Sequence, residues 1–289
     1  MAKAAGRAAG PRQPSQALLR LLERLAPELD ASVNDAQLRC FDAMEAPDQA
    51  GRLRIAAEAL RLNPAAADGW GLLAQASPPG SPLTLHLWRV AAAAGLVALG
   101  PFPLAPGEAW GVMESRPYMR ARCGLALELR RQGEAAAAIA EVEGMLALNP
   151  NDNQGMRYIL LAWLLEDGAD PAAAALFERY EEDGSAFWAY GAALLAYRRQ
   201  GPGEAADAAR AAAVANNPHV AAALLGRSTP RPGAIGYTPG SPEEAAEVVP
   251  DALPAWRGTA GALDWLAAGL GAAPAPKRGR RPRAAGEEA

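Results

Sequence analysis

The stretch Leu146-Ala147-Leu148-Asn149-Pro150 is followed, 68 residues further on, by a second stretch with the same ending, Ala215-Asn216-Asn217-Pro218. Gly133 and Gly201 each precede one of these prolines by seventeen residues, so they keep the same spacing. Gly184 lies midway between the two prolines. Because 68 is twice 34, the spacing indicates a repeat of 34 residues with glycine near its middle and proline near its end.

A 34-residue period is typical of the tetratricopeptide repeat, a hairpin of two helices that stacks on copies of itself. A single hairpin cannot bury its apolar faces, so the period persists only where neighbouring hairpins stack. Earlier in the chain Leu62-Asn63-Pro64 has the same ending, and Trp70 then falls where the repeat has tryptophan. We therefore expect an all-α fold, a tetratricopeptide-type helical-hairpin solenoid (an α-α superhelix) with disordered termini.

The register also divides the chain into segments. Pro64 and Pro150 are 86 residues apart, 18 more than two periods, and we place these extra residues mainly in the Pro- and Gly-rich segment 100–117. The two ends lack hydrophobic periodicity, which is typical of disorder. The expected segments are a disordered arm at 1–14, divergent helical repeats at 15–99, a connecting insertion at 100–117, firm repeats at 118–226, a linker at 227–240, capping helices at 241–271 and a disordered basic tail at 272–289.

Apolar residues in the first half of the chain predict buried helix faces. A helix near 34–44 is predicted to turn Leu38 and Phe41 inward, because both are large and apolar. In the insertion, Trp110 and Met113 are expected to hold the segment against the body of the protein.

The second half of the chain has clearer helix signals. Helices are predicted at 156–165 and 172–180, with Trp163 and Phe177 buried. Ser241-Pro242-Glu243-Glu244 has the pattern of a capping box, in which Ser and Glu side chains bond to backbone N–H groups of the first turn. We expect a C-terminal helix to begin there.

Several short motifs in the second half of the chain resemble those of a known protein family. The most specific is Asn149-Pro150-Asn151-Asp152-Asn153-Gln154-Gly155-Met156-Arg157-Tyr158, and others lie at 114–121, 217–220, 224–226, 240–245, 255–257 and 261–263. Together they resemble bacterial tetratricopeptide-repeat proteins related to the suppressor-of-tumorigenicity-7 family, over about 110–266. Ala221 stands where that family tends to have proline, and Pro250 and Pro254 are expected to bend or split the last long helix. The resemblance implies a helical repeat array and brings no established catalytic activity.

In tetratricopeptide repeats the first helix of each hairpin lines a concave groove, which positions 2, 5, 9 and 12 face. In the firm repeats these positions include Arg120, Gln154, Arg157, Trp188 and Arg198. Such side chains suit an acidic or carboxylate-ended peptide, through bidentate pairing and stacking. Alternatively, Arg120 and Arg157 pair with carboxylates of the protein itself, such as Glu128 or Asp152. Cys123 and Leu127 occupy positions 5 and 9 of the first firm repeat, which argues against the Lys- and Asn-based clamp that binds chaperone tails.

Polar residues also gather at two helix starts one repeat apart, and we expect them to form one cluster of Arg116, Tyr118, Asn153, Gln154, Arg157 and Tyr158. N-capping by Asp152 or Asn153 accounts for part of this, and the cluster either staples adjacent repeats or receives a partner. His219 follows a helix-ending proline and either caps carbonyls or contacts a ligand. The candidate partner-binding residues are Arg116, Tyr118, Arg120, Asn153, Gln154, Arg157, Tyr158, Trp188, Arg198 and His219.

The sequence gives little support for catalytic or metal chemistry. His86 and His219 are the only histidines, so a metal site would depend mostly on carboxylates. No glycine-rich phosphate loop follows a strand. Cys40 and Cys123 lack zinc-site spacing and are expected to be small buried or half-buried side chains. We expect no enzyme activity, no cofactor and no metal.

Charge differs between the body and the ends. The 289-residue chain carries a net charge of −4, but residues 1–16 and 277–289 each carry +3, so the body carries −10. An acidic body argues against a nucleic-acid platform on the folded part. Three roles are open for the basic tail. It is a solvated, solubilising segment, it contacts nucleic acid or an anionic surface, or it docks onto the acidic body of the protein. Its basic residues are Lys277, Arg278, Arg280, Arg281 and Arg283.

These features lead to two function hypotheses. The first is a non-catalytic scaffold or adaptor that binds a protein or peptide partner in its groove. The alternative is a nucleic-acid- or ribosome-associated accessory protein that uses the basic tail. The first sixteen residues hold no apolar signal-peptide core, and the apolar stretches at 91–99 and 159–165 are shorter than the ~20 residues of a membrane helix. We therefore expect a cytoplasmic protein without membrane insertion.

Overall fold

The computed structural model describes residues 15–25, 29–100, 107 and 109–270. Within these residues the chain forms fourteen α-helices and one short 3-10 helix, without a β-strand. The predicted all-α fold is therefore confirmed. The predicted arm at 1–14, the basic tail at 272–289 and part of the insertion lie outside the described residues. The chain divides into two compact units, unit 1 up to Trp163 and unit 2 from Leu164 onward.

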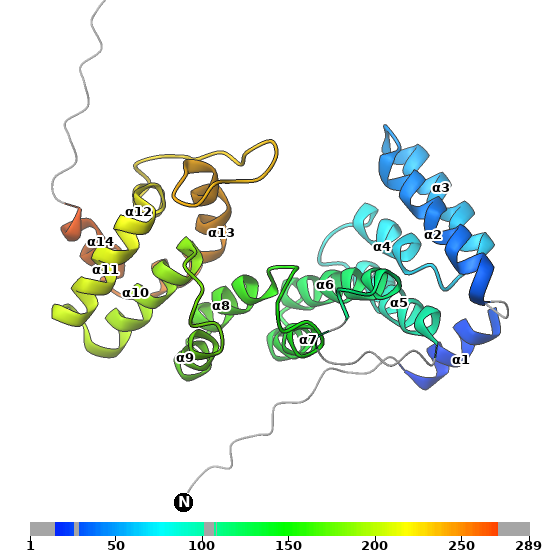
Figure 1. Ribbon diagram of the computed structural model, residues 1–289, viewed down its shortest axis with the longest axis horizontal. Coiled ribbons are helices and arrows are strands. Elements are labelled where there is room, and N and C mark those ends of the chain that lie inside the picture. Colours follow the sequence, from blue (N-terminus) through cyan, green and yellow to red (C-terminus); the bar gives the residue numbers. More distant parts are fainter. Residues whose placement is uncertain (1–14, 26–28, 101–106, 108, 271–289) are drawn as a thin grey trace, which may run out of the picture. The chain divides into compact units, whose positions relative to one another are not determined.

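Unit 1 is built from successive helical hairpins (Figure 1). α2 packs against α3, α4 against α5 and α6 against α7, and α3 contacts α4 as α5 contacts α6. The first helices of the hairpins, α2, α4 and α6, also contact one another in this order, and α1 packs against α5. The elements are α1 (Gln16–Leu25), α2 (Leu29–Glu45), α3 (Gln49–Leu62), α4 (Ala67–Ala76), α5 (Pro82–Leu99), the 3-10 helix (Met113–Ser115), α6 (Arg116–Arg131), α7 (Ala135–Leu148) and α8 (Met156–Glu166), which continues into unit 2.

The predicted inward face of α2 is wrong. Leu38 and Phe41 are exposed, and the buried face carries Ala36, Cys40 and Ala43 instead. These three small side chains pack against alanines of α3, against Ala66, which precedes α4, and against Leu72 within α4. Small residues allow the helix backbones to approach closely, so they occupy the interface although leucine and phenylalanine are more apolar.

α5 is a core helix of unit 1. Among the described residues it alone is long and apolar enough to cross a membrane by length and composition, and 61% of it is buried inside the protein. It contacts α1, α4 and α6. Gly95 permits the approach of α6, because a Cβ at this position would lie only 2.8 Å from the Cα of Tyr118.

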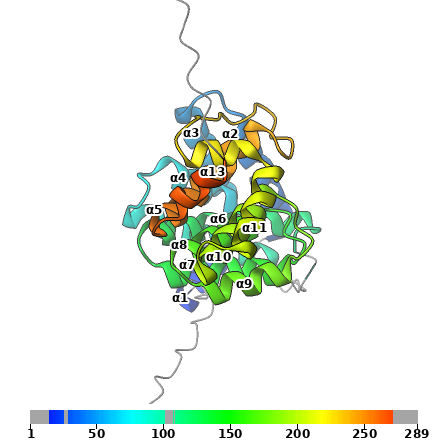
Figure 2. The same ribbon diagram turned by 90° about the vertical axis from the view of Figure 1, so that its left-hand side faces the viewer.

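Unit 2 also consists of paired helices (Figure 2). α10 packs against α11 and α12 against α13, while α14 contacts α11 and α13. The helices predicted at 156–165 and 172–180 are confirmed as α8 and α9; Trp163 is buried, whereas Phe177 is only half-buried. The helices are α9 (Asp170–Arg179), α10 (Ala186–Gln200), α11 (Glu204–Asn216), α12 (Pro218–Leu224), α13 (Pro242–Gly258) and α14 (Ala262–Gly269).

The Asn-Pro dipeptides that set the repeat spacing lie where second helices end. Asn63, Asn149 and Asn217 directly follow α3, α7 and α11, and all three are buried. The Oδ1 of Asn63 accepts the N–H of Ala65 at 2.8 Å, and the Oδ1 of Asn217 accepts that of His219 at 2.9 Å. The asparagine side chain therefore turns the chain, and the proline, which has no N–H, prevents the helix from continuing.

α13 begins as predicted but is not split. The Oγ of Ser241 accepts the N–H of Glu244 at 3.2 Å, which confirms the serine half of the capping box. The carboxylate of Glu244 bonds elsewhere, so the other half of the box is not formed. Pro250 and Pro254 lie inside the helix, which runs from Pro242 to Gly258 without a break.

Candidate binding pocket

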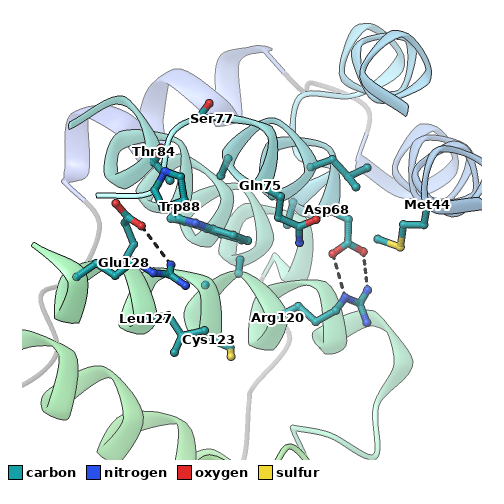
Figure 3. A pocket seen from close by; sticks show the side chains of 18 of the residues that line it. Met44, Asp68, Gln75, Ser77, Thr84, Trp88, Arg120, Cys123, Leu127 and Glu128 are labelled. Carbon is teal, nitrogen blue, oxygen red and sulfur yellow. Dashed lines mark hydrogen bonds and ion pairs between the residues drawn. The ribbon is translucent and has the colours of Figure 1, made fainter. Parts of the chain in front are cut away.

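Unit 1 contains a pocket of about 430 Å³ that is lined by residues of α2, α4, α5 and α6 and by Gln154 (Figure 3). Met44, at the end of α2, forms part of the rim. Figure 3 shows the indole of Trp88 between two groups of charged side chains, one around Asp68 and the other around Glu128. The pocket therefore has an aromatic centre and polar ends.

The ring of Trp88 lies in a slot between two glycines. α5 supplies the ring, α4 supplies Gly71 and α6 supplies Gly124. A Cβ at Gly124 would lie 2.4 Å from the ring, and a Cβ at Gly71 would lie 3.1 Å from it. The absence of side chains at both positions keeps the ring in the pocket.

Gly124→Ala is expected to lower the free energy of unfolding by about 1–3 kcal/mol, because the added methyl group would overlap the Trp88 ring. Gly184→Ala is the matched control, since no atom lies within 4 Å of a Cβ at that position. It should change stability by no more than about 0.5 kcal/mol. Urea denaturation of both variants measures the difference, and superimposable curves would show that the slot is not tightly packed.

The Asp68 end of the pocket joins the first helices of three hairpins. Asp68 is buried, and its Oδ1 accepts the Nε–H of Arg120 at 3.0 Å. Its Oδ2 accepts a second N–H of Arg120 and the Nε2–H of Gln37 at 2.6 Å. α2, α4 and α6 are thus connected through one carboxylate, in a bidentate arrangement that gives both strength and direction.

The Glu128 end connects α6 to the turn before α5. The Glu128 side chain is fully buried, and its Oε1 accepts the N–H of Gly80 at 2.8 Å and the Nε2–H of Gln132 at 3.2 Å. Its Oε2 pairs with the half-exposed Arg131 at 3.3 Å. These hydrogen bonds and the ion pair offset the free-energy cost of burying the Glu128 carboxylate.

Two of the predicted partner-binding residues, Arg120 and Gln154, line this pocket. Cys123 and Leu127, which the repeat register also turns toward the groove, line it as well. The Oε1 of Gln154 is buried and has no hydrogen-bond partner among the described residues.

The specific motif around Asn149–Tyr158 forms local contacts at the start of α8. Asp152 adopts a positive φ of 49°, and its carboxylate accepts the N–H groups of Met156 and Arg157, each at 2.8 Å. Arg157 also pairs with Asp152 at 3.2 Å and donates to the hydroxyl of Tyr158 at 2.6 Å. Capping by Asp152 is therefore confirmed, although burial raises the pKa of its carboxyl against these hydrogen bonds. Asn153 is exposed.

The other predicted members of this cluster have their own partners. Arg116, the first residue of α6, donates to the carbonyl of Trp110 at 3.1 Å and lies over its ring, so the two residues contact each other within the segment 100–117. Met113 was expected, like Trp110, to hold the insertion against the body of the protein, but it is exposed. The guanidinium of Arg122 lies over the ring of Tyr118, 5.7 Å from its centre, and burial raises the pKa of this tyrosine.

The remaining predicted residues belong to unit 2, where two of them take part in packing. Trp188 is 5% exposed and contacts the rings of Phe177 and Tyr180. His219 is exposed. Arg198 donates to four groups, namely the carbonyl of Leu165, the carboxylate of Asp170, the carbonyl of Ala255 and the hydroxyl of Thr259.

Several residues of the pocket were not predicted from the sequence. Asp68, Gly71 and Gln75 occupy positions 2, 5 and 9 of the register that Trp70 sets, so applying the groove rule to this less regular repeat would have found them. Trp88 carried no such signal, because it lies on a second helix, whose side chains the groove rule does not cover.

Both cysteine thiols are affected by burial. Burial raises the pKa of Cys40 to about 12 and also raises that of Cys123, so both thiols stay protonated at neutral pH. Among the described residues no three His, Cys, Asp or Glu side chains are grouped so that they could hold a metal ion. Comparison of the chain with protein-family models, with curated proteins and with solved structures finds no match.

Proposed function

We propose that this protein is a non-catalytic scaffold of the tetratricopeptide type, which binds a segment of a partner protein at the pocket of unit 1. One observation carries the proposal: equivalent positions of successive first helices converge on the pocket. Arg120 follows Asp68 by 52 residues, which is one period plus the 18-residue insertion, and Gln154 follows Arg120 by one further period. The same offset relates Gly71 to Cys123 and Gln75 to Leu127, and all seven residues line the pocket.

The charges around the pocket favour an apolar anchor over an acidic tail. The two arginines that line the pocket each pair with a carboxylate of the protein, Arg120 with Asp68 and Arg131 with Glu128. An acidic peptide would have to displace these carboxylates. A partner side chain placed against Trp88 would instead bury apolar surface.

Filling the pocket tests the proposal. Gln75 is exposed and lines the pocket, so Gln75→Trp should occupy it without disturbing the core. The matched control is Gln200→Trp, at the exposed end of α10 in unit 2. In affinity capture from cell extract with quantitative mass spectrometry, the Gln75 variant is expected to lose a partner by about tenfold or more, since losing ~1.4 kcal/mol of binding has this effect.

Thiol labelling gives a second measurement. A bound partner should slow alkylation of Cys123, while Cys40, which is buried away from the pocket lining, reports any unfolding. Deleting residues 277–289 separates this role from association with nucleic acid through the tail. Capture of the same partners by the intact protein and the Gln75 variant would refute the pocket as the binding site.

A further inference from the structure

α2 exposes a strip of large apolar side chains. Leu38, Phe41 and Met44 are 61%, 40% and 37% exposed and follow one another at intervals of three residues. This spacing places Leu38 and Phe41 on the side of the helix opposite the buried Ala36 and Ala43, and Met44 at the edge of that side, one turn after the buried Cys40. We call these three residues the α2 strip. Because Met44 also forms part of the pocket rim, the strip is continuous with the pocket.

α2 belongs to the first hairpin of unit 1, and one flank of this hairpin is not covered by another hairpin among the described residues. α4 lies between α2 and α6, whereas α2 packs against α3 and α4 and, among the described residues, has no hairpin on its other flank. Terminal repeats of helical arrays usually turn a polar face outward. α2 instead offers apolar residues at a spacing that fits the ridge of another helix.

The charges beside the strip distinguish between occupants. Asp35, Asp42 and Glu45 are exposed on α2. The one cation of α2, Arg39, already pairs with Asp42 at 2.9 Å and with Glu58 at 2.6 Å. Arg52 of α3 donates to the carbonyl of Met44 at 3.4 Å, so one cation lies at the Met44 end of the strip. A second copy packed symmetrically on the strip would bring the same acidic residues face to face, and an anionic membrane would be repelled.

We propose that the α2 strip binds a basic amphipathic helix of a partner protein. The apolar ridge of that helix would cover Leu38 and Phe41, its lysines or arginines would face the acidic residues, and one end would reach the pocket beside Met44. Burying the apolar ridge supplies affinity, and the charge pattern supplies selectivity. This inference rests on the proposed scaffold function and names the class of segment that the scaffold receives.

A synthetic helix tests the inference directly. The probe is a peptide of about 17 residues, the length of α2, with leucine at positions i, i+3, i+4 and i+7 and lysine on the flanks. A second peptide carries glutamate in place of lysine. Fluorescence anisotropy with the full chain should show binding of the basic peptide and at least tenfold weaker binding of the acidic one.

Substitutions on the strip should remove this binding. The double variant Leu38→Ala/Phe41→Ala and the charge reversal Asp42→Lys/Glu45→Lys should each weaken the basic peptide by about tenfold. Both change exposed residues, so the fold should persist, and circular dichroism checks this. The control is Ile235→Ala, which removes an equally apolar, fully exposed side chain from unit 2.

Three results would overturn the inference: equal binding of the two peptides, unchanged affinity in the Leu38/Phe41 variant, or a dimer in sedimentation that this variant dissociates. If one of these occurs while Gln75→Trp still abolishes partner capture, the scaffold function stands and only the helix class is refuted. If the basic peptide binds as expected but Gln75→Trp changes no captured partner, the pocket is refuted instead.

Discussion

Replacing Arg122 by alanine is expected to lower the free energy of unfolding by about 3–5 kcal/mol, because Glu141 would then be a buried charge without its cation. The Nε of Arg122 donates to a carboxylate oxygen of Glu141 at 2.8 Å, and its Nη2 donates to the backbone carbonyl of Glu141 at 3.1 Å. The two side chains are only 7% and 6% exposed. The pair joins α6 to α7, the two helices of one hairpin.

Two further variants show whether burial causes this effect. Arg89→Ala removes an arginine from a long ion pair with Glu134, at 3.6 Å, whose side chains are 45% and 35% exposed, so it should change stability little. Arg122→Met combined with Glu141→Leu removes both charges and should recover most of the loss, as replacement of buried pairs by apolar residues often does. The measurement is urea denaturation followed by circular dichroism. The interpretation fails if Arg122→Ala and Arg89→Ala unfold at the same urea concentration.

The positions of the hairpins could be predicted because helix ends have local signals. Gly133 and Gly201, which the repeat spacing singled out, have φ values of 78° and 69°, a region that glycine enters without steric cost. They follow the first helices of their hairpins, as Asn149-Pro150 and Asn217-Pro218 follow the second helices. A turn depends on the few residues that form it, so its sequence is informative on its own.

The buried faces were harder to predict because they depend on distant partners. Leu38 and Phe41 are more apolar than Ala36 and Ala43, yet the alanines are buried, since α3 offers alanines in turn and the helices come close together. The spacing of apolar residues within α2 cannot show how closely α3 packs against it. This error also concealed the α2 strip, which became visible only as exposed apolar surface.

The candidate site was predictable to the extent that it follows the repeat. Arg120 and Gln154 were predicted because they occupy the same position in adjacent predicted repeats. The partner of Arg120, Asp68, takes the same position in the register that Trp70 sets, but it lies before the insertion, outside the repeats from which the groove residues were predicted. Arg198, in turn, follows the repeat rule but donates to groups within unit 2, so a position in the register does not ensure a free side chain.

Glu244 belongs to the predicted capping box of α13, but its carboxylate bonds to residues outside this helix. It is 1% exposed, and its carboxylate accepts three hydrogen bonds within unit 2. The donors are the N–H of Ala186 at 3.2 Å, the Nδ2–H of Asn217 at 2.9 Å and the N–H of Gly240 at 2.6 Å. The first turn of α13 is thereby attached to the beginnings of α10 and α12.

Glu244→Ala is expected to lower the free energy of unfolding of unit 2 by about 3–5 kcal/mol. Each buried donor left without an acceptor costs about 1–3 kcal/mol, and the three losses are not fully additive because relaxation and water recover part of them. Glu244→Gln keeps the shape and one acceptor oxygen, so it should cost less. Glu247→Ala, an exposed position on the same helix, is the control and should change little. Native-state hydrogen exchange, read at α10, α12 and α13, makes the comparison specific, because the Glu244 variants should lose protection at all three helices. Loss of protection confined to α13 would mean that this carboxylate stabilises its own helix and does not join the three.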